Sequence, residues 1–366
     1  KTKIDDKQNL ADFIKGVHGD LRKQVQKADG DFHSVWQEHS RNLPLLQEYS
    51  RSMKELAIEH WQGNNLRRIE WCRDVCVEYF YHGGYEQCLR KDCKRILFDS
   101  DQHQNCSCPT EADNLLLRLN SDDYQVKSDK LVLLDVGSCF NPFQVFSDVF
   151  IPVAIDLCPA EKSVFACDFL FLDIIQDVGN SSESISTSPG STCTVSSHHC
   201  SFPDWMRNCI VSGSKITKLP QNSFDVVVFC LLLSYFPARM QRWTCCVKAH
   251  QLLKDDGLLL IITPDSSHQN KNMAMIKSWK IAIEGIGFSR WKYQKDDHTH
   301  CMAFRKKIVC RGKFKKESGE EAPHELLYIH QELDQNFAEE DGCSEVVYTK
   351  EKTSDLAEGF HALPFA

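Results

Sequence analysis

The chain has 366 residues, of which 42% are hydrophobic and 26% are charged, and its formal net charge at pH 7 is −8. This length leaves room for two domains with cores of ordinary size, and the composition excludes a collagen-like or wholly disordered chain. Because no segment approaches the roughly 18 consecutive apolar residues of a membrane-spanning helix, and the first residues lack an apolar signal segment, the sequence predicts a cytoplasmic protein with no membrane span.

Residues 1–125 are predicted to form an all-α helical domain. Apolar side chains recur at helical spacing in three segments, at about residues 10–25, 45–61 and 66–81. Gly83 and Gly84 follow the third segment and suit the left-handed position that ends many helices.

The cysteines of this region raise the question of a zinc site. The chain has 18 cysteines, and six of them lie between Cys72 and Cys108 without a C-x2-C pair. Cys72 and Cys76 are one helical turn apart on an apolar face, so we interpret the cysteines as buried thiols and predict no metal.

From Lys130 the pattern changes to short apolar runs that alternate with helical stretches. Such runs predict a mostly parallel sheet covered on both faces, and the last two, which follow each other closely, predict an antiparallel hairpin. This is the α/β Rossmann fold of class I methyltransferases, with seven strands, although composition alone equally allows a dehydrogenase. We assign this domain to residues 126–310. The runs are 131–136, 151–156, 163–167, 224–230, 257–263, 288–293 and 300–306.

Two segments are predicted to lie outside the packed core. Residues 179–201 contain nine serines and are predicted to form a mobile insertion. Metal binding by His198, His199 and Cys200 within it is the less favoured alternative. Residues 311–366 form an acidic tail; from residue 317 onward it carries 13 acidic side chains against two lysines, so residues 1–316 carry +3. A nearly neutral folded part does not predict a nucleic acid partner.

The residues that follow the apolar runs form the candidate site, because ligands of open parallel sheets bind at the carboxyl ends of the strands. Gly137 follows the first run and allows a ligand to approach the backbone. Asp156 ends the second run, where a carboxylate can accept both hydroxyl hydrogens of a ribose. Asp168 and Phe169 follow the third run, where they can meet an adenine amino group and its ring. Together these residues favour an adenosine-containing ligand.

The turn after the first run separates the candidate ligands. Dinucleotide-binding folds place G-x-G-x-x-G there, so that helix N-terminal amides bind a diphosphate. In this chain the three positions hold Gly137, Cys139 and Pro142. A turn with one glycine favours S-adenosylmethionine, which carries no phosphate, over NAD.

Several motifs resemble the S-adenosylmethionine sensors of the mTOR pathway, the SAMTOR family, over about residues 10–310. They include LLDVGSCFNPF, VAIDLCPA, CDFL, LLLSYFP, LLLIITPDSSHQN and the earlier RIEWC. The family is related to yeast enzymes that methylate adenine N1 in large-subunit ribosomal RNA.

By this resemblance, Gly137 and Asp156 contact the nucleoside, and Asp168 and Phe169 hold the adenine. Cys230, at the end of the fourth run, is expected to line the methionine side of the ligand through its backbone. Arg68 of the RIEWC motif is expected to pair with the ligand carboxylate, or alternatively to be a surface helix residue paired with Asp74 or Glu70.

The resemblance also implies a sensor that binds S-adenosylmethionine, with S-adenosylhomocysteine as a competing ligand. The implied partners are the GATOR and KICSTOR complexes, from which the ligand releases the protein, with recruitment to the lysosomal surface through them. The alternative is an RNA adenine-N1 methyltransferase that uses Ser234 and Tyr235 after the fourth run. The ribosomal enzymes have Asn where this chain has Ser234, so we predict no catalytic residue. A dehydrogenase-like dinucleotide binder is the third and least favoured reading.

Overall fold

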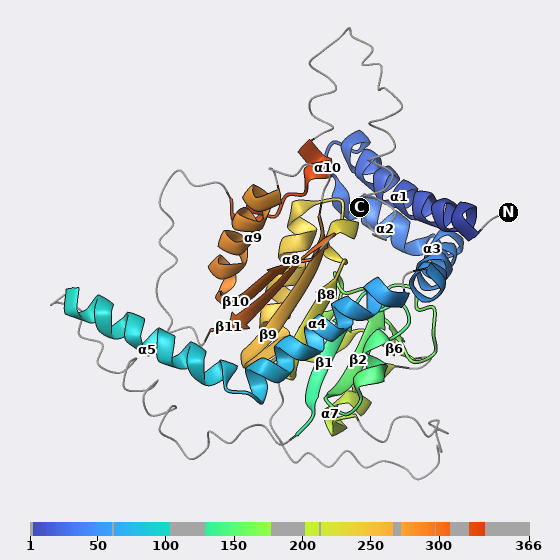
Figure 1. Ribbon diagram of the computed structural model, residues 1–366. Helices are drawn as coiled ribbons and strands as arrows, with labels where there is room; N and C mark the ends of the chain where they lie inside the picture. The colour runs from blue at the N-terminus through green and yellow to red at the C-terminus, as the bar shows by residue number, and fades with distance from the viewer. Residues whose placement is uncertain are drawn as a thin grey trace, which may run out of the picture.

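Figure 1 shows a computed structural model of the chain, which describes residues 3–60, 62–102, 129–176, 202–211, 214–265, 272–296, 298–307 and 322–333. The first helices precede a central twisted sheet, and further helices alternate with its strands. The helical segments are α1 (Lys3–Lys27), α2 (Phe32–Arg41), α3 (Leu43–Glu55), the π-helix η1 (Leu56–His60), α4 (Gln62–Phe80), α5 (Gly84–Gln102), the 3-10 helix η2 (Pro142–Phe146), α7 (Asp204–Arg207), the 3-10 helix η3 (Leu233–Tyr235), α8 (Arg239–Leu252), α9 (Asn272–Ile286), the 3-10 helix η4 (Pro323–Leu326) and α10 (His330–Leu333).

The central sheet has the strand order β10-β11-β9-β8-β1-β2-β3-β6-β5, and β4 pairs with β7 in a second, two-stranded sheet. The pairs from β9 to β6 are parallel, whereas β11 runs antiparallel between β9 and β10. From β10 to β3 this is the class I methyltransferase topology. The strands are β1 (Leu131–Val136), β2 (Phe150–Asp156), β3 (Phe165–Ala166), β4 (Asp173–Ile175), β5 (Ile210–Val211), β6 (Lys215–Ile216), β7 (Lys218–Pro220), β8 (Phe224–Cys230), β9 (Leu253–Pro264), β10 (Phe288–Lys295) and β11 (Thr299–Lys306).

The predicted α/β fold and its terminal hairpin are confirmed, and the structure adds strands that the sequence did not indicate. The short strands β5 and β6 extend the sheet beyond β3, so the described sheet has nine strands instead of seven. These strands have two residues each, too few to show an apolar alternation.

The two faces of the sheet are covered by helices from different parts of the chain. Val132, Leu134 and Val136 of β1 belong to one buried cluster with residues of α8 and α9. Leu131 and Leu133 face the other side, where they share a second cluster with residues of α4. A central strand buried on both faces explains why β1 is apolar at nearly every position.

Helix α4 covers a face that the chain's own β1–β2 connection leaves open. That connection contains only the five-residue helix η2, too short to cover the apolar side chains of β1, β8 and β9. Ile69, Cys72, Cys76 and Tyr79 of α4 are buried there instead, and α4 crosses in front of the strands in Figure 1. Gly83 has φ +79, which confirms its predicted place after this helix.

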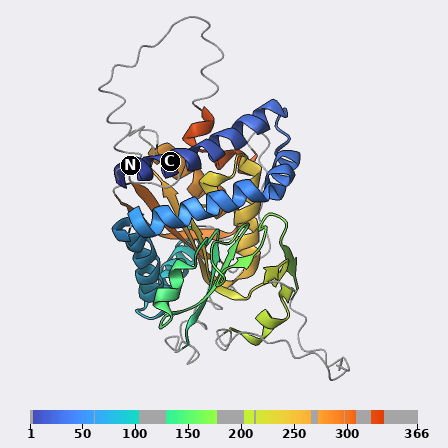
Figure 2. The ribbon, with the colours of Figure 1, turned by 90° about the vertical axis from the view of Figure 1, so that its right-hand side faces the viewer.

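Helices α1, α2 and α3, which we call the helical roof, lie beyond one end of the sheet (Figures 1 and 2). Val17, Leu21, Val35 and Trp36 of the roof belong to the same buried cluster as the strands β1, β2 and β8. The region predicted as residues 1–125 therefore shares its core with the sheet. None of the described helices combines the length and apolarity needed to cross a membrane.

Residues 322–333 fall within the predicted acidic tail but pack against α8 and α9. Leu327 and Ile329 are buried in the main cluster. The Arg242 guanidinium, which is fully buried, donates to the Leu327 carbonyl at 2.6 Å and pairs with Glu332. The predicted serine-rich insertion at 179–201 lies outside the described residues.

Candidate functional site

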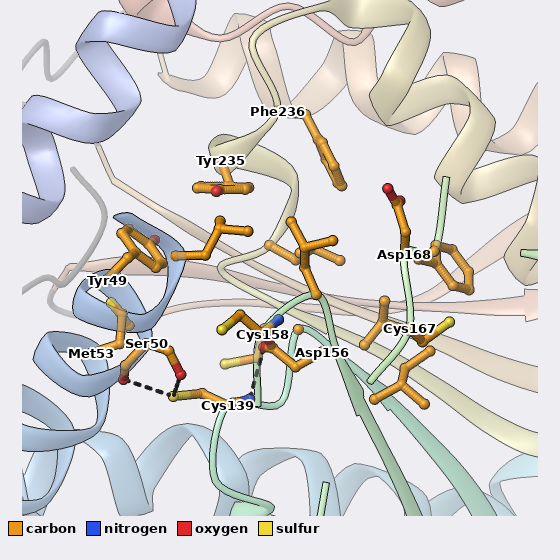
Figure 3. Close-up of a pocket in the computed structure, with 18 of the residues that line it drawn as sticks. Tyr49, Ser50, Met53, Cys139, Asp156, Cys158, Cys167, Asp168, Tyr235 and Phe236 are labelled. Atoms are coloured by element: carbon orange, nitrogen blue, oxygen red, sulfur yellow. Dashed lines mark hydrogen bonds between the residues drawn. The ribbon is translucent and has the colours of Figure 1, made fainter. Parts of the chain in front are cut away.

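A pocket opens at the carboxyl ends of β1, β2, β3 and β8, beneath the helical roof (Figure 3). Its empty volume is about 760 Å³, open solvent at its mouth included. The residues that line it are Trp36, Leu46, Tyr49, Ser50, Met53, Val136, Gly137, Cys139, Ile155, Asp156, Leu157, Cys158, Cys167, Asp168, Phe169, Cys230, Leu232, Tyr235 and Phe236.

The turn after β1 bends back toward β2 through left-handed residues. Gly137 has φ +75, and Cys139 and Asn141 both have φ 56. The amides of Gly137 and Ser138 donate to the Ile155 carbonyl, and the Ser138 hydroxyl donates to Asp135 at 2.6 Å. Burial raises the Asp135 pKa to about 7. Asp135 stabilises this turn through the Ser138 hydroxyl and does not itself line the pocket.

Asp156 ends β2 and points into the pocket. One carboxylate oxygen accepts the Cys139 amide at 3.0 Å and the other accepts the Cys158 amide at 2.8 Å. Burial raises its pKa to about 6, although these two amide bonds oppose the shift. Each carboxylate oxygen has a second lone pair, so the fixed carboxylate is able to accept two more hydrogens, such as those of a vicinal diol.

Asp168 and Phe169 lie in the loop after β3. Asp168 accepts the Leu170 amide on one oxygen and the Trp36 indole N–H on the other, at 3.1 and 3.0 Å. Burial raises the Asp168 pKa. The Phe169 ring is buried edge to face against Phe229, so it forms part of the wall of the pocket.

Aromatic and histidine side chains close the pocket on the side of the helical roof. Tyr235 lies after β8, and its hydroxyl is hydrogen-bonded to Nε2 of His39 on α2. Tyr49 of α3 is hydrogen-bonded to Nε2 of His18 on α1 at 2.8 Å, and the two tyrosine rings are 5.3 Å apart. Burial lowers the pKa of His18 to about 3 and that of His39 to about 4, so both imidazoles are neutral at pH 7.

Cys230 ends β8 and lines the pocket, and Arg68 of α4 lies next to it. Burial raises the Cys230 pKa to about 11, and a hydrogen bond from the Arg68 guanidinium opposes the shift. Arg68 is 5% exposed, which does not fit the surface alternative. It lines a second hollow, between α4 and the β10–β11 hairpin, rather than the main pocket.

The structure thus brings five of the six predicted site residues together in the pocket lining. Arg68, the sixth, lies outside the lining and contacts Cys230 from the other side. Of the two side chains considered for catalysis, Ser234 is buried outside the pocket lining and donates to the Leu231 carbonyl at 3.0 Å. Tyr235 does line the pocket.

The cysteines of α4 and α5 are buried free thiols. Burial raises the pKa of Cys72, Cys76 and Cys88. Within the described ranges, no group of three or more metal-binding side chains converges. Cys106 and Cys108, and the histidines of the serine-rich insertion, lie outside those ranges.

The roof residues of the pocket were not identified from the sequence. Trp36 lies on α2, a helix that the sequence pattern did not single out, and Tyr49, Ser50 and Met53 lie on α3. Nothing in their spacing distinguishes them from ordinary core residues. Two N-caps mark the starts of these helices: the Asp31 carboxylate accepts the Ser34 amide at 3.0 Å before α2, and the Asn42 side chain accepts the Leu45 amide at 3.3 Å before α3.

Comparison with curated proteins finds close relatives along nearly the whole chain. A Xenopus laevis protein named "S-adenosylmethionine sensor upstream of mTORC1" is 41% identical over 365 residues, covering 98% of this chain and 84% of the relative. A Danio rerio protein of the same name is 40% identical over 368 residues, covering 98% of this chain and 85% of the relative. No protein-family profile matches the chain.

Two solved structures are among the similar folds. The Bradyrhizobium japonicum N-methyltransferase NodS, in complex with S-adenosylhomocysteine, has a TM-score of 0.28 and 15% identity, covering 60% of this chain and 98% of NodS. A Burkholderia thailandensis 1,6-didemethyltoxoflavin-N1-methyltransferase has a TM-score of 0.27 and 15% identity, covering 61% of this chain and 89% of that enzyme.

Proposed function

This chain belongs to the family of S-adenosylmethionine sensors upstream of mTORC1, and we propose that it binds S-adenosylmethionine in the pocket beneath the helical roof. We further propose that the ligand releases it from the GATOR and KICSTOR complexes, and that recruitment to lysosomes occurs through these partners. The observation that carries the proposal is that one pocket joins carboxylates at the strand ends to side chains of the roof.

The residues that follow successive strands match successive parts of this ligand. Asp156 accepts the ribose hydroxyls, and Asp168 and Phe169 hold the adenine. Gly137 contacts the nucleoside beside Asp156, and Cys230 borders the methionine portion. Arg68 contacts the wall from behind, through the Cys230 thiol, and its pairing with the ligand carboxylate stays a prediction.

The turn after β1 supports a ligand without phosphate. Diphosphates are bound by the amides at the start of a full helix that follows a glycine-rich turn. Here that turn leads into a five-residue 3-10 helix that begins with Pro142, which has no amide hydrogen. S-adenosylmethionine has no diphosphate and therefore does not need the amides of a helix N-terminus at this place.

Sensing requires that the ligand favour one arrangement of the protein over another, because a ligand shifts an equilibrium only by its differential affinity. Ligand contacts to Trp36 and Tyr49 exist only when the helical roof is docked. Bound ligand therefore stabilises the docked roof, and a partner that recognises another arrangement loses its binding surface.

The same geometry favours sensing over RNA methylation. The Ser234 hydroxyl is used within its own loop, and the Tyr235 hydroxyl is bonded to His39. Both groups therefore serve the loop and the roof. Transfer of a labelled methyl group from S-adenosylmethionine to total RNA, lost on Tyr235→Phe, is the result that would favour the enzyme instead.

The proposal is tested by calorimetric titration of the purified protein with S-adenosylmethionine, S-adenosylhomocysteine and NAD. We expect the first two to bind and NAD to bind at least tenfold more weakly. Asp156→Ala and Gly137→Asp should abolish ligand binding, whereas Asp148→Ala, at an exposed loop position, should not.

Association with purified GATOR and KICSTOR is then measured with and without S-adenosylmethionine. The parent protein and Asp148→Ala should dissociate when the ligand is added, and Asp156→Ala should stay bound. If Asp156→Ala responds to the ligand as the parent protein does, the proposed site is wrong.

A further inference from the structure

Lys248 of α8 is tied to the loop that carries Asp168. Its ammonium nitrogen lies 3.2 Å from the Phe169 carbonyl oxygen, 2.7 Å from that of Leu170 and 2.7 Å from that of Leu172. An ammonium group has three hydrogens to donate, so all three are directed at one short loop.

This loop has little other regular structure to fix its shape. Strand β3 ends at Ala166, and residues 167–172 form no strand or helix. Within the loop, Asp168 accepts the Leu170 amide, and the Phe171 amide donates to the Asp168 carbonyl oxygen. The three carbonyls on Lys248 therefore hold the backbone on which the Asp168 carboxylate is mounted.

Lys248 also lies close enough to act electrostatically on that carboxylate. Burial raises the Asp168 pKa; hydrogen bonds from Trp36, Leu170 and Phe171 oppose the shift, and the Lys248 ammonium adds a smaller effect in the same direction. An ionised carboxylate accepts on both oxygens and has no hydrogen of its own to donate. One of them already accepts the Trp36 indole N–H and the other the Leu170 amide, so the direction in which the remaining lone pairs point depends on the loop.

We propose that Lys248 is a positioning residue that aims the Asp168 carboxylate at the exocyclic amino group of a purine ligand, and so confers preference for adenine over hypoxanthine. This inference rests on the proposed function, because it takes S-adenosylmethionine as the ligand. A carboxylate attracts an amino donor and repels the oxygen that replaces it in hypoxanthine. Lys248 itself lies outside the pocket lining.

The test compares two ligands on the full chain, S-adenosylmethionine and its counterpart with hypoxanthine in place of adenine. We expect the parent protein to prefer the adenine form at least tenfold. Lys248→Met should weaken binding of the adenine form about tenfold or more and leave the hypoxanthine form within about threefold, so that the preference collapses. Lys248→Arg should restore most of it, because it supplies charge and several donors.

Lys254→Met is the matched control. Lys254 is paired with the buried Asp225 at 3.1 Å, away from the pocket, so this variant removes a lysine from a buried carboxylate without touching the loop. Both affinities should stay within twofold of the parent values. Lys248→Gln supplies two donors without charge and provides a second variant if Lys248→Met does not fold.

The outcomes separate the two proposals. A parent protein that binds neither ligand contradicts the proposed function. A parent protein that binds S-adenosylmethionine, with Lys248→Met or Lys248→Gln keeping the parental preference between the two ligands, overturns the role of Lys248. If Lys248→Met weakens the binding of both ligands equally, the role of Lys248 is also overturned. That result would indicate general damage to the pocket rather than a changed orientation of the Asp168 carboxylate.

Discussion

At the scale of single residues, Asp156 combines burial with a requirement for charge. Its carboxylate is fixed by the amides of Cys139 and Cys158, yet burial raises its pKa from 3.8 to about 6. The cost of burying the ionised form is therefore present in full above pH 6 and is relieved as the pH falls toward 3.8. Ligand hydroxyls need the ionised form. Lower pH therefore relieves the cost to folding stability but weakens ligand binding.

We expect the affinity for S-adenosylmethionine to be constant above about pH 7 and to fall as the pH drops below 6, by up to tenfold per pH unit. Protonation of Asp156 removes an acceptor for the ribose, and the raised pKa of Asp168 adds to the same trend. Titration calorimetry from pH 5 to pH 8 measures this. Asp156→Asn should bind weakly with a shallower profile. A parent profile that is flat down to pH 5 would contradict the assignment.

At the scale of elements, α4 packs directly on the sheet. The Tyr79 side chain is fully buried, donates to the Asp256 carbonyl at 3.0 Å, and packs edge to face on Trp291, with centroids 4.9 Å apart. These contacts join α4 to the bulged first part of β9 and to β10. Loss of α4 would expose the apolar face of the sheet.

Tyr79→Ala should lower the free energy of unfolding by about 3–5 kcal/mol, the usual cost of removing a buried aromatic ring. Tyr79→Phe, which removes only the hydroxyl, should cost about 1 kcal/mol. Urea unfolding followed by tryptophan fluorescence and by far-ultraviolet circular dichroism should give one shared transition for each variant. Separate transitions, with only the helical signal shifted by Tyr79→Ala, would show that the helices unfold as an independent domain.

At the scale of the whole molecule, the pocket is where the helical roof and the sheet meet. Trp36 reaches the strand-end carboxylate Asp168, and His39 reaches Tyr235. A ligand at this junction stabilises both parts together, by an amount that grows with its concentration and reaches about 2.7 kcal/mol at a hundred times the dissociation constant.

Saturating S-adenosylmethionine should slow hydrogen exchange in α2 and α3 as well as in the loops that follow β1, β2 and β3. Ligand contact with the roof suppresses the local openings through which these helices exchange. Helix α5, which contributes no pocket residue, serves as an internal control and should not change. Slowed exchange confined to the strand-end loops would mean that the roof does not respond to the ligand.

Much of the fold and half of the site followed from local patterns. The runs that became β1, β2 and β8 were apolar at most positions. Gly137 after the first run and Asp156 at the end of the second marked the ligand edge. Trp36 and Tyr49 had no such marker, because a roof residue is defined by what lies across the pocket. Arg68 shows the same limit, since its position on α4 gave no information on which hollow it would line.

The sequence by itself determined where the parallel strands lie along the chain and the chemistry at their ends, because apolar runs and the residue after each run are local properties of the chain. Only the tertiary structure decided that α4 covers the face left open by the short η2, that α2 and α3 close the pocket, and that Lys248 holds the Asp168 loop. Those arrangements depend on burying apolar surface between segments far apart in the chain, and no local pattern encodes which surfaces will meet.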